Sequence, residues 1–412
     1  MSKLKLKAEV LKNQYILLSL FAAGLLFWSS LAALLPTLPL YMEDVGATKQ
    51  QIGIVLGCFA IGMLLFRSVF GHLADQRGRK IVLIIGMLVN AISPLGYILV
   101  QSIPGLMAVR AFHGLSVAAF TTGYLALVAD LAPEKNRGEI MGYMSLVTPI
   151  GAAIGPALGG YLQATSGYTL LFLLSTGLAG MGLLCIVPIV NPPIHKQNKT
   201  DSNQGKFWQL LFSPRVRVLA SIMLMIGLAF GALHTFVPLF IKAARVDLNP
   251  GLFYTAGALA SFSVRFFTGK ASDRYGRGLF ITLSLFIYAI SMLILAFATT
   301  ANIFLIAGTL EGAGSGILMP MISTVIADRS LPQERGRVFS LCIMGLDFGI
   351  AIAGPIFGSL AEQVGYRNMF SFCGGLTVLA LLIFLTQGNK NFADSLRFAL
   401  GRSKDAYSLN QS

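Results

Sequence analysis

Three charged side chains, Arg110, Glu311 and Asp347, stand deep inside segments that are otherwise apolar. A charge at the centre of a membrane-spanning helix costs about 2.5–3.5 kcal/mol, so we expect each to face a cavity or a partner. A carboxyl group there can exchange a proton with a nearby base or bind the cationic group of a ligand. These residues therefore predict a cavity in which protons and a small molecule compete, although a fixed pair between helices would use the same side chains.

Four further residues are candidates for the same cavity. His113 and His234 lie in apolar segments, and imidazole exchanges protons near neutral pH. A hydrogen-bonded packing role is the simpler explanation for both histidines. Phe27 and Trp28, in the first apolar segment, are candidates for lining the cavity. Because the first half of the chain has no acid in mid-segment, proton exchange is expected to depend on the second half or on a histidine.

The elements that carry these residues are predicted to be membrane-spanning helices. The chain is 55% hydrophobic and 12% charged with a mean hydropathy of +0.73, whereas soluble domains contain roughly 25% charged residues. Its apolar segments have the length of about 20 residues or more that a helix needs to cross a bilayer. The predicted spans are 14–42, 52–74, 80–102, 104–130, 138–162, 168–190, 216–241, 251–271, 278–299, 302–327, 337–361 and 367–387. Proline is expected to break the first span at Pro36 and the seventh at Pro238.

The distribution of positive charge predicts the orientation of these spans. The net charge is +14, but the basic residues are concentrated on one side of the predicted membrane. The opposite side holds Lys49, Lys242, Arg245 and Arg367. This asymmetry places both termini in the cytoplasm and indicates contact with a lipid bilayer, not with nucleic acid.

A repeat divides the chain into two similar halves. Residues 71–80 recur as residues 269–278, and residues 130–138 recur as residues 328–336, in both cases 198 positions later. Such a repeat is typical of transporters built from two pseudo-symmetric parts. We therefore predict an all-α membrane protein with twelve transmembrane helices in two six-helix halves. The predicted divisions are an N-terminal half 1–190, a cytoplasmic linker 191–215, a C-terminal half 216–387 and a cytoplasmic tail 388–412.

Two sets of motif residues follow from the repeat. The first set is expected to form a cytoplasmic gate, in which Asp75 caps a helix or pairs with Arg137; a basic loop that only sets topology is the alternative. The gate residues are Gly71, Asp75, Arg77, Gly78, Arg79, Lys80, Arg137, Asp273, Arg274 and Arg277. The second set consists of small residues and kinking prolines that let helices approach closely. These packing residues are Gly142, Gly151, Gly155, Pro156, Gly159, Gly160, Gly354 and Pro355.

These motifs resemble those of the major facilitator superfamily from about residue 14 to 387. The segment 71–80 matches the family's loop motif except at Gln76, where arginine is usual. The glycines from Gly142 to Gly160, with Pro156, match the helix 5 motif of the twelve-helix drug–proton antiporter branch. Arg110 with Gly114 matches the helix 4 motif of the proton-coupled members. The resemblance implies a loop that latches the two halves and a helix 5 surface at the contact between them.

The resemblance and the buried charges together predict a secondary transporter in the plasma membrane. Its expected work is the export of a small amphipathic or cationic organic compound in exchange for protons. Alternatives are an exporter of a sugar, siderophore or other metabolite, a uniporter, or a non-transporting membrane sensor. We expect the protein to have no enzymatic activity and to need no cofactor or metal. We also expect it to be a monomer. The tail 388–412 is predicted to be either disordered or a short interfacial helix with Phe392, Leu396 and Leu400 on one face.

Overall fold

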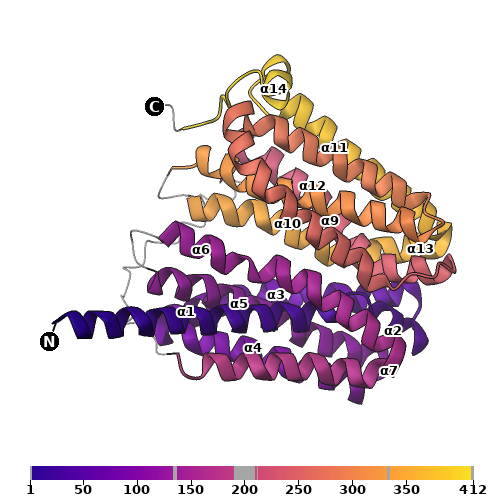
Figure 1. Cartoon of the computed structure of the whole chain (residues 1–412). Coiled ribbons are helices and arrows are strands. Elements are labelled where there is room, and N and C mark those ends of the chain that lie inside the picture. The colour runs from indigo at the N-terminus through magenta and orange to yellow at the C-terminus, as the bar shows by residue number, and fades with distance from the viewer. Residues whose placement is uncertain (1, 133–136, 190–208, 211, 332–334, 410–412) are drawn as a thin grey trace. The chain divides into compact units, whose positions relative to one another are not determined.

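The structure is a computed structural model that describes residues 2–132, 137–189, 209–210, 212–331 and 335–409. Within these ranges, the side chains of residues 2–14, 137–138, 269–270, 273 and 335–337 are outside the description. Helices and short connections make up all of the described residues, without a strand (Figure 1). The helices are α1 (Ser2–Ala33), α2 (Leu38–Asp44), α3 (Lys49–Arg77), α4 (Arg79–Leu99), α5 (Ile103–Leu131), α6 (Arg137–Ser145), α7 (Val147–Ile186), α9 (Pro214–Ala243), α10 (Pro250–Tyr275), α11 (Arg277–Ala296), α12 (Ala301–Asp328), α13 (Arg335–Gln387) and α14 (Phe392–Ala399).

The described part of the chain contains 9 segments that are long and apolar enough to cross a membrane. The two longest belong to α7 and α13, and each is interrupted by a glycine with a positive φ, 80° at Gly167 and 77° at Gly365. A residue with a Cβ is strained in this conformation, which is why glycine stands there. Both glycines lie in the connections predicted between adjacent spans. The prediction of an all-helical, multi-pass membrane protein is confirmed.

Proline is expected to break the helix at Pro36 and at Pro238, and the structure differs between these two positions. Residues 34–37 form a turn that separates α1 from α2, so the predicted break near Pro36 is confirmed. Helix α9, in contrast, continues through Pro238 to Ala243, so the break expected there is wrong. A proline late in a helix removes one hydrogen bond, and neighbouring backbone can absorb that loss without ending the helix.

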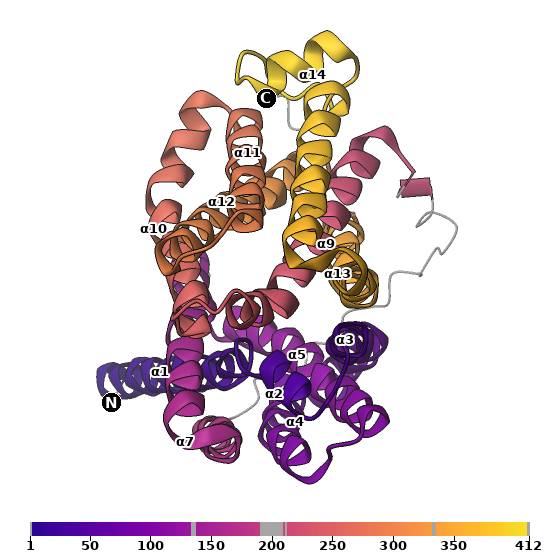
Figure 2. The ribbon, with the colours of Figure 1, turned by 90° about the vertical axis from the view of Figure 1, so that its right-hand side faces the viewer.

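The chain divides into two compact units. Unit 1 comprises Met1–Val45 and Cys58–Asn198, and unit 2 comprises Gly46–Gly57 and Lys199–Ser412. In unit 2, the end-on view shows α9 beside α13 and α10 beside α12 (Figure 2). Helix α3 contributes its first residues to unit 2 and the remainder to unit 1. Most of the predicted linker 191–215 lies outside the described residues.

Glycines set the close contact between α1 and α7 in unit 1. A Cβ on Gly151, Gly155 or Gly159 of α7 would overlap atoms of α1 between Trp28 and Ala33. The helix backbones therefore pack directly against each other, as small residues permit in membranes. Pro156 and Gly160 are buried on the same helix, whereas Gly142 is exposed with open space around it. The described contacts of this motif lie within unit 1, and its predicted role between the halves stays a prediction.

The corresponding motif in unit 2 has shifted by one residue. Ala353 of α13 packs against Gly231 of α9, which repeats the contact of Gly155 with α1. Gly354, one position later, is rotated by about 100° on the helix. It faces Gly53 of α3, and a Cβ on either of these glycines would overlap the other's backbone. Pro355, the next residue, is half-buried inside α13.

Candidate functional site

A hydrogen-bond network surrounds His113 at the core of unit 1. Asn90 donates through Nδ2 to the Phe27 carbonyl oxygen (3.4 Å) and to Ser30 Oγ (3.3 Å). Its Oδ1 therefore accepts from Nε2 of His113 at 2.9 Å, and this network assigns the ring proton to Nε2. Nδ1 then accepts from the Tyr97 hydroxyl group at 3.1 Å. Both ring nitrogens of His113 are satisfied, so the imidazole is held in one neutral tautomer.

Arg110 lies next to this histidine, one helical turn earlier on α5. The residue is 9% exposed, and its guanidinium group lies 4.3 Å from the centre of the Phe59 ring. Nη1 lies 3.5 Å from Nδ1 of His113, and Nε has no hydrogen-bond partner among the described residues. The described ion pairs do not include Arg110. Among the described residues of unit 1, the buried cation therefore contacts a ring face and an imidazole and forms no ion pair with a carboxylate.

Glu311 occupies the core of unit 2 with its hydrogen-bonding capacity incompletely used. The residue is 7% exposed on α12. Tyr288 of α11 and Ser315 lie beside its carboxyl group. Even so, neither Oε1 of Glu311 nor the Tyr288 hydroxyl group has a partner with hydrogen-bonding geometry among the described residues. A buried polar atom without a partner is unfavourable by about 1–3 kcal/mol, and in native proteins it commonly marks a functional position.

The two clusters stand at equivalent positions of the repeat. His113 and Glu311 are 198 residues apart, as are Asn90 and Tyr288. A Cβ on Gly114 would overlap the Phe59 carbonyl oxygen, and a Cβ on Gly312 would overlap that of Gly257, again at the same offset. The two repeats thus share a close crossing, of α5 with α3 and of α12 with α10, beside the positions where α5 and α12 carry the polar residues His113 and Glu311.

Of the remaining cavity candidates, Asp347 and Phe27 are buried, whereas His234 and Trp28 are partly exposed. Asp347 of α13 is 6% exposed. His234 of α9 stacks on Tyr254, with ring centres 5.2 Å apart, and its Nδ1 has no partner among the described residues. Phe27 is fully buried, and its ring stacks on that of Phe120 with the ring centres 3.9 Å apart. The rings of Phe27 and Trp28 are nearly perpendicular, with their centres 5.5 Å apart. The structure thus brings Arg110 and His113 together in unit 1, and it places Glu311, Asp347 and His234 in unit 2.

The charged loop motifs form matching ion pairs. Arg79 Nε lies 3.2 Å from Asp130, and Arg277 pairs with Asp328 at the equivalent position of unit 2. Asp75, which is largely exposed, lies 3.6 Å from Arg79. Gly78 and Gly276 precede these arginines with φ of 93° and 91°, a conformation that requires glycine.

The other predicted gate residues have varied surroundings. Lys80 donates to the Val187 carbonyl oxygen at 2.7 Å, and Arg274 lies over the Tyr275 ring. Gly71 has open space around it, and Arg77 is exposed. The side chains of Arg137 and Asp273 are outside the described residues. The predicted pair of Asp75 with Arg137 therefore stays a prediction.

Sequence reasoning missed Tyr288 and Tyr97. A tyrosine in an apolar segment is ordinary, so neither stands out by type or spacing. The repeat carried a usable signal for Tyr288, because its partner position 198 residues earlier is Asn90, an amide in mid-span. The described residues contain no group of three histidine, cysteine or acidic side chains that could hold a metal.

An all-helical fold with polar residues buried in long apolar helices defines a multi-pass integral membrane protein whose buried chemistry suits a transporter. The sequence profile of the Major Facilitator Superfamily matches residues 20–270 and 246–397. The chain belongs to this family and is a membrane transporter, not an enzyme.

Comparisons with individual proteins agree with this assignment. The chain is 25% identical to the "Quinolone resistance protein NorA" of Staphylococcus aureus (strain COL), over 90% of this chain and 96% of that protein. It is 26% identical to the "Staphylopine export protein" of Staphylococcus aureus (strain Mu50 / ATCC 700699), over 92% and 98% of the two chains. The solved structure of a mutant of the nucleoside transporter NupG matches with a TM-score of 0.77 at 15% identity, covering 89% of this chain and 98% of that one. This last likeness supports the fold alone.

Proposed function

We propose that the chain crosses the membrane twelve times, as two six-helix halves with both termini in the cytoplasm. The breaks at Gly167 and Gly365 support a division of α7 and α13 into two spans each. Helix α10, with 26 residues, is long enough to cross as well. The concentration of basic residues at one side supports the orientation in the plasma membrane.

The work proposed for this transporter is the export of a small amphipathic or cationic organic compound in exchange for protons, by a monomer that alternates between open states. The similarity to NorA over nearly the whole length of both chains supports a drug-type substrate. Arg110, Glu311 and Asp347 are the proposed cavity charges, with His113, His234, Phe27 and Trp28 around them. The repeated ion pairs at Arg79 and Arg277 are the proposed cytoplasmic gate elements.

The observation that carries the proposal is the incomplete hydrogen bonding of Glu311. His113, at the equivalent position of unit 1, has both ring nitrogens in hydrogen bonds, so a second proton on the ring would require the Tyr97 bond to reverse beside the Arg110 cation. Glu311 retains an unpartnered oxygen beside an unpartnered Tyr288 hydroxyl group. A carboxyl group in this condition can take up either a proton or a cationic ligand, and exchange between the two is the basis of antiport.

Proton flux in proteoliposomes tests the proposal. Wild type and the Glu311→Gln and Asp347→Asn variants are reconstituted with an internal pH-sensitive dye, and lipophilic cations, anions and neutral metabolites are added in turn. Glu139→Gln is the matched control, because Glu139 is an exposed carboxylate on α6. We expect at least one amphipathic cation to drive proton flux, and Glu311→Gln to reduce that flux by at least about tenfold, equivalent to about 1.4 kcal/mol.

Two outcomes would contradict parts of the proposal. If compounds cross without proton movement and Glu311→Gln changes only affinity, the protein is a uniporter or is coupled to another ion. If only neutral or anionic metabolites are moved, the chain is a metabolite exporter. The comparable identity to the staphylopine export protein is the observation that favours this second function.

A further inference from the structure

The segment that follows α13 is folded onto the end of unit 2. Helix α14 begins after Asn391, whose side chain accepts from the backbone N–H of Asp394 at 2.8 Å and caps the helix. The chain then turns at Gly401, where φ is 71°, and continues to Leu409. The backbone N–H of Leu409 donates to the Asp328 carbonyl oxygen at 2.8 Å. The family profile ends at residue 397, so much of this tail lies beyond it.

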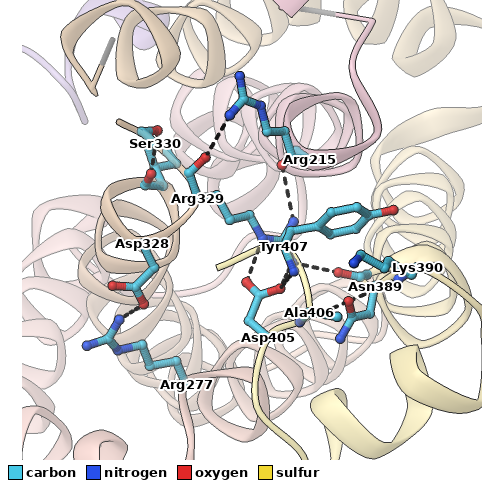
Figure 3. A network of polar contacts seen from close by, with 12 residues as sticks. Arg215, Arg277, Asp328, Arg329, Ser330, Asn389, Lys390, Asp405, Ala406 and Tyr407 are labelled. Carbon is cyan, nitrogen blue, oxygen red and sulfur yellow. Dashed lines mark hydrogen bonds and ion pairs between the residues drawn. The ribbon is translucent and has the colours of Figure 1, made fainter. Parts of the chain in front are cut away.

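Arg329 fixes the tail in place. This arginine is fully buried, and its guanidinium group binds Asp405 through Nε at 2.6 Å and Nη2 at 3.1 Å (Figure 3). The same group donates to the carbonyl oxygens of Gly388 (2.6 Å) and Arg215 (3.2 Å). A bidentate arginine–carboxylate pair has a single preferred geometry. Arg329 therefore joins the ends of α12, α13 and α9 to the tail and sets the position of α14.

Helix α14 has one face docked on unit 2. Its buried residues are Ser395, Phe398 and Ala399. The Phe398 ring packs against Phe384 of α13, with centres 5.9 Å apart, and the Ala399 carbonyl oxygen accepts from Thr282 of α11 at 2.8 Å. At about 100° per residue, these three side chains cover one third of the helix circumference.

The adjacent face of α14 is apolar and exposed. Phe392, Leu396 and Leu400 are 62%, 37% and 42% exposed. They recur every four residues, so they form a stripe along the helix beside the docked face. Asp394 lies on the opposite side of the helix from this stripe. A stripe of three large apolar side chains next to a docked face indicates a surface that contacts an apolar phase.

The segment that carries the stripe is also rich in exposed positive charge. The basic residues of the tail are all exposed: Lys390, Arg397, Arg402 and Lys404. Of the two acids in the tail, Asp405 is bound by Arg329, which leaves Asp394 on the far side of the helix. An apolar stripe with a basic border is the pattern of helices that lie in the headgroup region of an anionic leaflet.

We propose that α14 is a lipid-binding element, with Phe392, Leu396 and Leu400 inserted among lipids and the four basic residues bound to acidic headgroups. The position of the helix in the chain supports this occupant. Helix α13 crosses the membrane and ends at Gln387, five residues before α14 begins. Docking through Arg329 then holds the apolar stripe beside the bilayer, so the tail links the end of unit 2 to an anionic membrane surface. This inference rests on the proposed function only through the cytoplasmic location of the tail.

Fluorescence quenching by brominated lipids tests the inference on the full-length protein. A tryptophan is placed in the stripe by Phe392→Trp or on the opposite side of the same helix by Asp394→Trp. The chain's own 2 tryptophans are common to all variants, and the wild-type signal is subtracted. Each protein is reconstituted in liposomes of phosphatidylcholine alone or with phosphatidylglycerol, with bromine near the headgroup end of the acyl chains.

We expect quenching of the tryptophan at position 392 to exceed that at position 394 at least twofold and to increase when phosphatidylglycerol is present. Replacing the four basic residues by glutamine should remove the dependence on the acidic lipid. Asp405→Asn should reduce quenching at position 392, because Arg329 then holds the tail less firmly. Equal quenching at the two positions overturns the proposal, as does protection of position 392 in every lipid, which would mean that the stripe is covered by protein and not by lipid. The quenching at each position and its dependence on phosphatidylglycerol are measured without substrate or proton flux. The proposed transport activity can therefore fail without affecting this result.

Discussion

At the centre of unit 1, Asn90 and His113 bind each other, whereas at the equivalent positions of unit 2 Tyr288 and Glu311 lie side by side without saturating their polar atoms. The surrounding helix crossing is the same in both units, because Gly114 and Gly312 each lie against a backbone carbonyl group. The difference therefore comes from side-chain chemistry on a common frame. One repeat satisfies its polar pair, and the other leaves polar atoms of the equivalent pair without a partner among the described residues.

The ends of the two repeats differ in a second way. Both carry the ion pair between an arginine and an aspartate, Arg79–Asp130 and Arg277–Asp328. The next residue is Leu131 in unit 1, which packs against the hydrophobic core, and Arg329 in unit 2, which binds the tail. A single change of residue type thus gives one repeat a buried charge that only a distant segment of the chain can neutralise.

Removing the partner of Arg329 should produce the largest effect. Asp405→Ala leaves a fully buried guanidinium group without its carboxylate, which is expected to lower the free energy of unfolding by about 3–5 kcal/mol. The double variant Arg329→Leu with Asp405→Ala, which restores the residue type of unit 1 at position 329, should be less destabilising than Asp405→Ala alone because it removes both charges of the pair. Thermal unfolding of the purified proteins in detergent measures both. If Asp405→Ala is as stable as wild type, the tail does not neutralise Arg329.

The shared helix crossing should respond alike in both repeats. Gly114→Ala and Gly312→Ala each place a methyl group against a backbone carbonyl oxygen, and overpacking of this kind is unfavourable by about 1–3 kcal/mol. Gly142→Ala is the control, because nothing lies within 4 Å of the position that its methyl group would occupy. The same thermal unfolding assay applies. A large loss in one repeat with none in the other would show that the two crossings are not equivalent.

The stability of the protein should depend on the polar pair of unit 1 and hardly at all on that of unit 2. Asn90→Leu removes the acceptor for the Nε2 proton of His113, which should lower the free energy of unfolding by about 1–3 kcal/mol. Tyr288→Phe removes a hydroxyl group that has no partner among the described residues, so stability should change by less than about 0.5 kcal/mol. Substrate-driven proton flux should nevertheless change in Tyr288→Phe. Equal destabilisation by the two variants would contradict the distinction drawn between the repeats.

The parts of this molecule that depend on local pattern could be predicted from the sequence. Apolar length predicted the membrane-spanning helices, and the break near Pro36 followed from the geometry of proline. Glu311 and Asp347 were recognisable because an acid in an apolar segment is costly. Tyr288 was not recognisable, because a tyrosine in such a segment is compatible with simple packing. The bond between Arg329 and Asp405 joins residues far apart in the chain, and no local pattern encodes such a contact.

The smallest expected effect concerns the repeated ion pairs. Arg79 and Asp130 are 22% and 39% exposed, and Arg277 and Asp328 are 29% and 25% exposed, so water screens both pairs. Double-mutant cycles with Arg79→Gln and Asp130→Asn, and with Arg277→Gln and Asp328→Asn, should each give a coupling energy of about 0.2–1 kcal/mol. Both values should decrease as salt is raised, because exposed charges are screened. A coupling above about 3 kcal/mol in unit 2 alone would mean that the pair is stabilised by docking of the tail, since Asp328 also accepts the backbone bond from Leu409. Similar small couplings in both repeats would instead mean that the loop motif is energetically symmetric, and that the asymmetry of the transporter arises at Glu311 and Arg329.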